Sequence, residues 1–235
     1  MAIIRTLARK SPVAISLLYS EAEHNFLVGL YPCDAKCYIQ LAAIILQRLY
    51  GDHQHLPAID PSVLAHILPR HLIPPISAPS PSTSINVGGS VTNSTYNQLV
   101  NKILSAHKQL ANTNLVQLQL LFLKYCWSLN VYGCTFFKAF MLMSKPLRGN
   151  LPVHVGVNDW GMSVINATTH KQVAALELKS LELKYTPNTN YLEATSRKRD
   201  FVATITTPQS MLINNLLKQL KTKVEAARSG STSHQ

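Results

Sequence analysis

The chain has 235 residues, of which 46% are apolar and 14% are charged, a composition that excludes a wholly disordered protein and leaves room for two domains. Its 22 Lys and Arg residues against 11 Asp and Glu residues give a net charge of +11, so its field attracts nucleic acid, anionic lipid headgroups or acidic peptides. No signal peptide pattern precedes the four cysteines (Cys33, Cys37, Cys126 and Cys134), which is typical of reduced thiols in a cytosolic protein. No apolar run is long enough to cross a membrane.

The first part of the chain has the apolar spacing of helices. Ser11-Pro12 resembles a helix cap followed by a first-turn proline, and apolar residues then recur at helical spacing until a break near Gly29. Residues 39–50 are almost continuously apolar and stop at Gly51-Asp52, which predicts a central helix buried nearly all round.

A polar segment interrupts these helices. Residues 74–95 are rich in Pro, Ser, Gly, Thr and Asn, so we predict a disordered insertion there. Helical spacing returns from Tyr96 to Leu110 and again from Leu115 to Leu129. Residues 1–132 are therefore predicted to form one helical bundle.

After Tyr132-Gly133 the apolar period changes to two. Val153, Val155 and Val157 alternate with smaller or polar residues, and turn signals separate about seven short strands as far as residue 206. A final helix is predicted to start with Thr207 as its cap and Pro208 as its first residue. Seven antiparallel strands closed by one helix indicate a PH or PTB-like domain over residues 133–226, with a disordered tail at 227–235.

Signals of catalysis and of cofactor binding are missing from the sequence. No phosphate-binding loop, dinucleotide fingerprint or nucleophile elbow occurs, and no pair of carboxylates has an apolar setting, so we expect neither an enzyme nor a cofactor. The only cluster that suggests a metal is Asp52 with His53, His55, His66 and His71, and its spacing matches no zinc pattern. We expect no metal site.

Four segments resemble the FERM domain. Residues 17–27 (LLYSEAEHNFL) resemble the opening of its second lobe, and residues 41–52 resemble the central helix of that lobe. Residues 125–137 (YCWSLNVYGCTFF) resemble the junction between the second and third lobes, and residues 151–161 (LPVHVGVNDWG) the first hairpin of the third. The resemblance implies an α+β chain with an acyl-CoA-binding-protein-like helical bundle followed by a PH-like sheet. A ubiquitin-like first lobe is not seen, so we expect a fragment or a chain that has lost the functions of that lobe.

Within FERM proteins the chain resembles the Krev interaction trapped (cerebral cavernous malformation) family most, by Cys126-Trp127 ahead of Tyr132-Gly133 and by the strand from Pro152 to Asn158. The iRhom-binding FERM proteins come next and share the turn at Tyr31-Pro-Cys-Asp34. The first resemblance implies a scaffold that is an effector of a Rap-type small GTPase and that binds the cytoplasmic tail of a heart-of-glass type receptor at cell junctions. Rap binding is the weaker expectation, because the main contacts fall on the first lobe.

The last helix carries the predicted partner site. Ile213, Leu217, Leu220 and Val224 form one narrow stripe that we expect to pack on the sheet. Leu216 lies at the margin of this stripe and Leu212 well outside it. Periodicity alone favours ordinary surface leucines over a partner site at these positions. By resemblance, Leu212 and Leu216 contact the receptor tail.

Basic residues near the end of the chain suggest a second kind of partner. They are Arg197, Lys198, Arg199, Lys218, Lys221 and Lys223. These side chains form either a solvated surface or a contact with anionic lipids such as phosphoinositides, and the two interpretations have equal weight. The expected location is the inner face of the plasma membrane, with the nucleus as a second location. Nucleic acid is not an expected partner, because no helix-turn-helix, zinc finger or ribonucleoprotein signature occurs.

Overall fold

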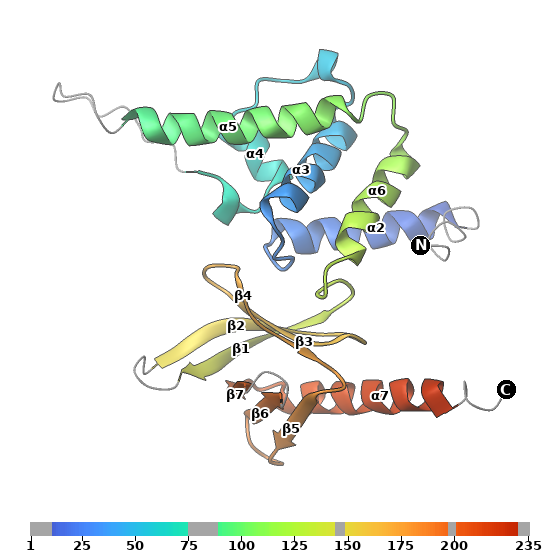
Figure 1. The fold of residues 1–235 in the computed structure, drawn as a ribbon, viewed down its shortest axis with the longest axis vertical. Coiled ribbons are helices and arrows are strands. Elements are labelled where there is room, and N and C mark those ends of the chain that lie inside the picture. The colour runs from blue at the N-terminus through green and yellow to red at the C-terminus, as the bar shows by residue number, and fades with distance from the viewer. Residues whose placement is uncertain (1–10, 75–88, 144–148, 197–200, 230–235) are drawn as a thin grey trace. The chain divides into compact units, whose positions relative to one another are not determined.

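The computed structural model describes residues 11–74, 89–143, 149–196 and 201–229 (Figure 1). The chain divides into two compact units, Met1–Leu129 and Asn130–Gln235. The first is built from helices and the second from an antiparallel sheet and one helix, so the predicted α+β fold class is confirmed.

The helical unit contains α2 (Pro12–Leu27), α3 (Ala35–Tyr50), α4 (Pro61–Ile67), α5 (Gly89–Lys108) and α6 (Leu115–Trp127), with short 3-10 helices at His53–His55 and Arg70–Leu72. Side chains cap several of these helices: Ser11, Asp34, Asp60 and Asn114 each accept a hydrogen bond from a backbone N–H in the first turn. Such caps satisfy donors that the helix itself leaves unpaired, so the chain between the helices fixes where each one starts.

The central helix α3 packs against α4, α5 and α6. Its residues 41–47 are all buried, which confirms the prediction of a helix covered nearly all round. The remaining helix, α2, packs on α6, where the Tyr19 and Phe122 rings meet edge to face with their centroids 4.9 Å apart. The buried apolar side chains of these helices form the hydrophobic core of the unit.

Helix α5 is longer than the sequence indicates. It begins at Gly89, inside the segment for which we predicted disorder, so that the last residues of 74–95 are helical. Residues 75–88 lie outside the described residues. The polar residues at the start of α5 have weak helix propensity, so they form helix only as an extension of the residues that follow. Those later residues are attached to the rest of the unit, since the Tyr96 hydroxyl donates to the Ile59 carbonyl at 2.8 Å.

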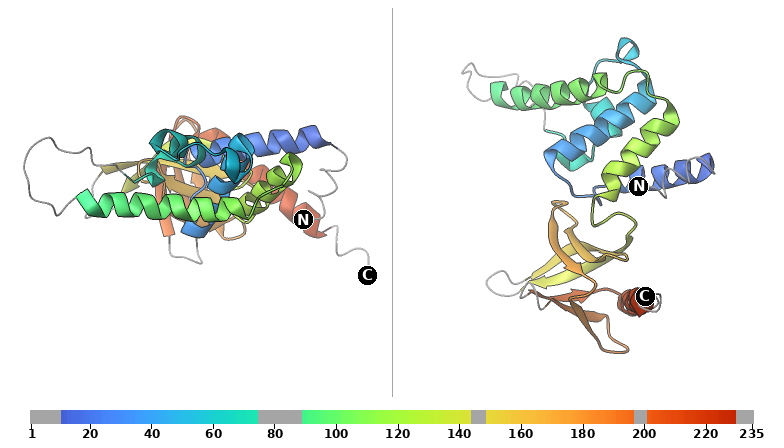
Figure 2. Two further views of the ribbon diagram at one scale, coloured as in Figure 1. Left: turned by 90° about the horizontal axis from the view of Figure 1, so that it is seen from above. Right: turned by 45° about the vertical axis from the view of Figure 1, so that its right-hand side comes forward.

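The second unit is a seven-stranded sheet in the order β4-β3-β2-β1-β7-β6-β5 with every pair antiparallel. The strands are β1 (Thr135–Met143), β2 (Gly149–Val157), β3 (Gly161–Asn166), β4 (Gln172–Glu177), β5 (Leu181–Tyr185), β6 (Tyr191–Ser196) and β7 (Phe201–Thr206). Helix α7 (Ser210–Ser229) contacts β5, β2 and β6. It is seen nearly end-on beside the strands in the right-hand view of Figure 2.

Alternation along the strands divides the sheet into two faces. Phe137, Ala139 and Met141 of β1 point into the core together with Val153 and Val155 of β2. The intervening residues point to the outer face, as expected for a period of two. The core thus lies between one face of the sheet and α7.

A buried asparagine closes the turn between β2 and β3. The Asn158 amide nitrogen donates to the carbonyls of Asn130 and Tyr132 at 2.9 and 2.8 Å, and its oxygen accepts from the backbone N–H groups of Trp160 and Gly161. Gly161 has φ of +152°, and a Cβ there would run into the backbone of Leu176 and Leu178. This turn therefore needs glycine.

Candidate partner-binding surface

The start of α7 is held to the sheet by hydroxyl groups. The Thr207 hydroxyl donates to the Lys138 carbonyl at 2.9 Å and accepts from the Gln209 N–H, and the Ser210 hydroxyl donates to the Thr189 carbonyl at 3.0 Å. Pro208 and Gln209 form a turn, and the helix begins at Ser210 rather than at Pro208 as predicted. The bond from the Gln209 N–H to the Thr207 hydroxyl is that of a capping side chain, as predicted for Thr207. At its other end α7 reaches Ser229, past residue 226, where we expected the third lobe to end.

The two faces of α7 have different environments. Ile213 and Leu217 are fully buried in the core, and Leu220 and Val224 pack against its edge, as the apolar stripe predicts. Leu212 is 53% exposed and its neighbour Met211 is 59% exposed. Since the fold already uses the opposite face, these two side chains form an apolar surface that the sheet does not cover.

The second predicted contact, Leu216, lies in an intermediate position. It is partly buried and packs against the core cluster. A polar substitution at Leu216 therefore affects the fold as well as any partner. Leu212 is the cleaner probe of this helix surface.

The basic residues of this unit differ in their surroundings. Lys218 and Lys223 are exposed on α7, whereas Lys221 is half-buried and donates a hydrogen bond to the Leu181 carbonyl. Lys221 thus helps to attach α7 to β5. Residues 197–199 lie outside the described residues, so their place in a lipid contact stays a prediction.

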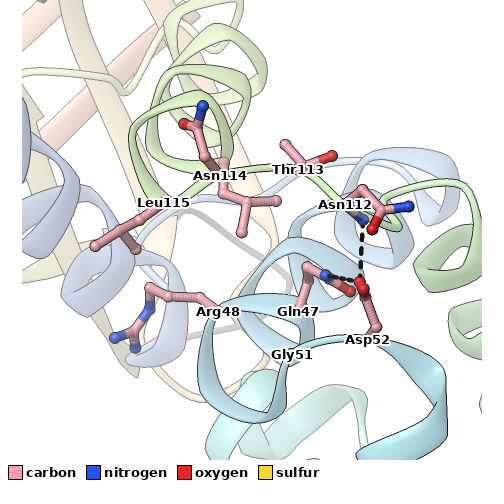
Figure 3. Close-up of a pocket in the computed structure, with 9 residues that line it drawn as sticks. Gln47, Arg48, Gly51, Asp52, Asn112, Thr113, Asn114 and Leu115 are labelled. Carbon is pink, nitrogen blue, oxygen red and sulfur yellow. Dashed lines mark hydrogen bonds between the residues drawn. The ribbon is translucent and has the colours of Figure 1, made fainter.

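The helical unit has a polar pocket of about 400 Å³ between the C-terminal end of α3 and the loop before α6 (Figure 3). Figure 3 shows Gln47 and Asn112 beside Asp52: the Gln47 amide donates to the carboxylate at 2.7 Å and the Asn112 N–H donates at 3.1 Å. Arg48 donates to Glu23 and Tyr19 of α2 at 2.8 and 2.9 Å. Most of these polar groups are hydrogen-bonded to one another, although Gln47 Oε1 is buried without a partner. The hydrogen bonds connect α3 to α2 and to the loop before α6, so the pocket mainly has a structural role.

The histidines expected to bind no metal are spread over the loop and short helices after α3. Within the described residues no three His, Cys, Asp or Glu side chains come close enough to hold a metal ion. His107, which the sequence did not single out, is buried, and Nε2 lies 3.0 Å from the Gly51 carbonyl. Burial lowers the pKa of His107, and nearby His53 lowers it further.

The cysteines are all free thiols. Cys33 and Cys37 share a hydrogen bond at the start of α3, which together with burial raises the pKa of Cys33. Burial also raises the pKa of Cys134, to about 12. The contact between Cys33 and Cys37 has no signal in the sequence, because Cys33 lies before the Asp34 cap and only Cys37 is in α3.

Among the helices of the described ranges, none is both long and apolar enough to pass through a membrane.

Two family models match the chain. The model of the FERM central domain matches residues 5–137, and the model described as KRIT1/FRMD8, FERM domain C-lobe, matches residues 151–216. FERM domain-containing protein 8 of Xenopus laevis is 30% identical over 185 residues, covering 72% of this chain and 40% of the relative. FERM domain-containing protein B of Dictyostelium discoideum is 28% identical over 169 residues, covering 68% of this chain and 31% of the relative. The chain thus spans two fifths or less of the length of these relatives.

Solved structures show the same fold at low identity. The human Myosin 7b C-terminal MyTH4-FERM domain, solved in complex with the harmonin-a PDZ3 domain, has a TM-score of 0.61 and 14% identity, over 88% of this chain and 38% of that one. The Dictyostelium discoideum Myosin VII MyTH4-FERM MF2 domain has a TM-score of 0.59 and 18% identity, over 94% of this chain and 39% of that one. Both likenesses concern the arrangement of helices and strands.

Proposed function

The chain belongs to the FERM family, and we propose that it is an adaptor whose C-terminal helix binds the cytoplasmic tail of a transmembrane protein. FERM domains are generally non-catalytic modules of protein interaction, typically associated with the cytoskeleton and the membrane. The prediction of a FERM domain is confirmed. Of the families named from the sequence, the iRhom-binding one, FERM domain-containing protein 8, is found among the relatives, and the C-lobe model is shared by both.

The observation that carries the proposal is the exposed apolar surface of α7. Leu212 presents more than half of its side chain to solvent, immediately beside the fully buried Ile213. Both leucines that the resemblance assigns to a receptor tail fall within residues 151–216, the segment matched by the C-lobe model. An apolar side chain on a rigid, well-anchored helix is a suitable anchor for a peptide, because little conformational entropy is lost on binding.

The candidate partners follow from the families that the chain resembles. We propose a tail of the heart-of-glass type or the cytoplasmic tail of an iRhom, bound at the inner face of the plasma membrane or at cell junctions. The role of Rap effector rests on the resemblance to the Krev interaction trapped family alone. It is a separate proposal, and a Rap protein loaded with a GTP analogue tests it.

The experiment is fluorescence anisotropy with labelled peptides of these two tails. We expect one of them to bind the chain, and Leu212→Asp to weaken that binding about tenfold or more, as is usual for an anchor residue. Val202→Asp is the matched control, because Val202 is an apolar residue on β7 that is even more exposed than Leu212 and belongs to a strand instead of the helix. Equal affinity of the chain and of Leu212→Asp for the bound tail would remove α7 from the site.

The alternative function is binding of anionic lipid through the basic surface. Lys218 and Lys223 are exposed on the same helix, which favours this alternative. Failure of both tail peptides together with capture by phosphoinositide vesicles would replace the adaptor proposal with the lipid one.

A further inference from the structure

The outer face of the sheet carries an apolar cavity of about 470 Å³. It is lined by residues of β1, β2 and β7, by one residue of the turn after β3, and by the proline before α7: Lys138, Ala139, Phe140, Pro152, Val153, His154, Ala167, Thr206 and Pro208. We call it the sheet-face pocket. Its lining does not include Leu212 or Leu216, so it is distinct from the helix surface proposed above.

Hydrogen bonds hold the walls of this pocket in place. The Ala167 N–H donates to the Pro152 carbonyl at 2.9 Å, which holds the turn against β2. On the other side, the Thr207 hydroxyl binds the Lys138 carbonyl and fixes Pro208 next to β1. Because these contacts are within the unit itself, the cavity is formed before any partner arrives, as binding pockets usually are.

The apolar surface of the pocket continues along the sheet. Phe140, which is 50% exposed, pairs with Pro152 on one side and with Thr206 on the other. Thr206 in turn pairs with the exposed Tyr191 of β6. Phe140 and Pro152 are thus apolar side chains directly opposite each other on a face that borders solvent, and such exposed apolar patches often mark interaction sites.

The charged and titratable groups of the lining are both basic. Lys138 is exposed, and His154 lies directly opposite it on the neighbouring strand, because the two are partners in the β1–β2 register. The His154 Nδ1 atom is buried and has no hydrogen-bond partner. Burial lowers the pKa of His154, as do the neighbouring His170 and Lys138, so its ring is neutral at neutral pH.

The buried nitrogen of His154 is closed off from solvent, so it offers no contact to a ligand. A cavity of about 470 Å³ with an apolar lining accommodates a large aromatic ring. The indole of tryptophan is the largest such ring among protein side chains. A carboxylate next to the ring would then lie within reach of Lys138.

We propose that the sheet-face pocket is a second docking site, which takes a tryptophan side chain of an acidic linear peptide. The indole fills the apolar cavity, and Lys138 pairs with a flanking carboxylate. A second copy of this chain is the weaker candidate for the same surface, because two molecules that each carry a charge of +11 repel one another.

The test is a titration of the ¹⁵N-labelled full chain with the synthetic peptide acetyl-Glu-Asp-Trp-Glu-Asp-amide, followed by NMR. We expect saturable shifts at the amides of Lys138, Phe140, His154 and Ala167. The same peptide with Ala in place of Trp, or with Lys in place of every acid, should cause no saturable shift at these positions. Shifts spread over all basic surfaces, or unchanged by loss of the tryptophan, would overturn the proposal.

Variants locate the site on the chain. Ala167→Phe fills the cavity and should weaken binding of the peptide about tenfold. Lys138→Glu should weaken it by a similar factor, because it replaces the attraction for the acidic peptide with repulsion. Ala65→Phe, at an exposed position of α4, is the matched control and should leave affinity unchanged. Should Ala167→Phe fail to fold, Lys138→Glu alone decides, because its side chain is at the surface. Leu212→Asp should bind this peptide normally, so failure of the second site and failure of the adaptor proposal are distinguishable.

Discussion

Leu212 and Leu217 are the same residue type on the same helix in opposite environments. Leu217 is fully buried in the core of the sheet unit, whereas Leu212 is exposed. We expect Leu217→Ala to lower the free energy of unfolding by about 2–5 kcal/mol, because it removes buried methyl groups and leaves a cavity. Leu212→Ala should change it by less than about 0.5 kcal/mol. Urea unfolding followed by circular dichroism checks this, and equal losses for the two variants would place Leu212 in the core.

His107 makes the stability of the helical unit sensitive to acid. Its pKa is lowered by burial and by His53, against the opposing effects of the Gly51 carbonyl and Asp52. The unfolded chain therefore takes up a proton at a higher pH than the folded one, and the free energy of unfolding falls as pH drops below about 6.5.

The variant that checks this is His107→Gln, whose amide can still donate to the Gly51 carbonyl. We expect its stability to fall less steeply than that of the parent chain between about pH 7 and pH 5, measured by denaturant unfolding at each pH. His66→Gln, at an exposed position of α4, is the control and should keep the slope of the parent. Parallel curves for the parent chain and His107→Gln would show that His107 is not the group responsible.

Among the elements, the β2–β3 turn depends on the amide of Asn158. Asn158→Asp places a carboxylate oxygen against the carbonyls of Asn130 and Tyr132, and we expect a loss of about 2 kcal/mol or more. Asn166→Asp is a matched control, since only the side-chain oxygen of Asn166 is used, as an acceptor from Thr168 and Thr169. Thermal unfolding of both variants measures the difference, and similar losses would mean that the donors of Asn158 matter little.

The elements differ in how well local pattern predicts them. The continuous apolar run of α3 and the alternation of β2 each reflect burial of one segment, so periodicity is enough to find them. The first turns of α5 have no such signal, because Ser, Thr and Asn there favour loops when taken by themselves. The start of α7 differs from the prediction by two residues, because Pro208 and Gln209 form a turn between the capping Thr207 and the helix.

The candidate site divides in the same way. The buried stripe of α7 and the exposure of Leu212 follow from helical spacing, since both are properties of one element. The sheet-face pocket was not predictable, because its lining joins β1, β2, β7 and a turn that come together only in the folded sheet. The unpaired nitrogen of His154 is likewise a product of tertiary packing.

For the whole molecule, the charge of +11 predicts a general attraction to anionic membranes. We expect the chain to float with vesicles that contain phosphatidylserine at low ionic strength and to be released as salt is added, since exposed charges are screened. The double variant Lys218→Glu with Lys223→Glu should be released at lower salt. The double variant Lys102→Glu with Lys108→Glu on α5 is the control, because it changes the net charge by the same amount. Binding that resists salt and ignores these changes would indicate a specific lipid pocket instead.

The central claim is that α7 receives a transmembrane protein's tail, and the most direct measurement is the footprint of a bound tail peptide on the ¹⁵N-labelled chain. Either the heart-of-glass type or the iRhom tail serves, whichever binds in the anisotropy experiment. We predict that the largest shifts fall at Met211, Leu212 and the neighbouring exposed positions of α7. Shifts confined to the sheet-face pocket or to the helical unit, with the amides of α7 unchanged, would contradict the claim.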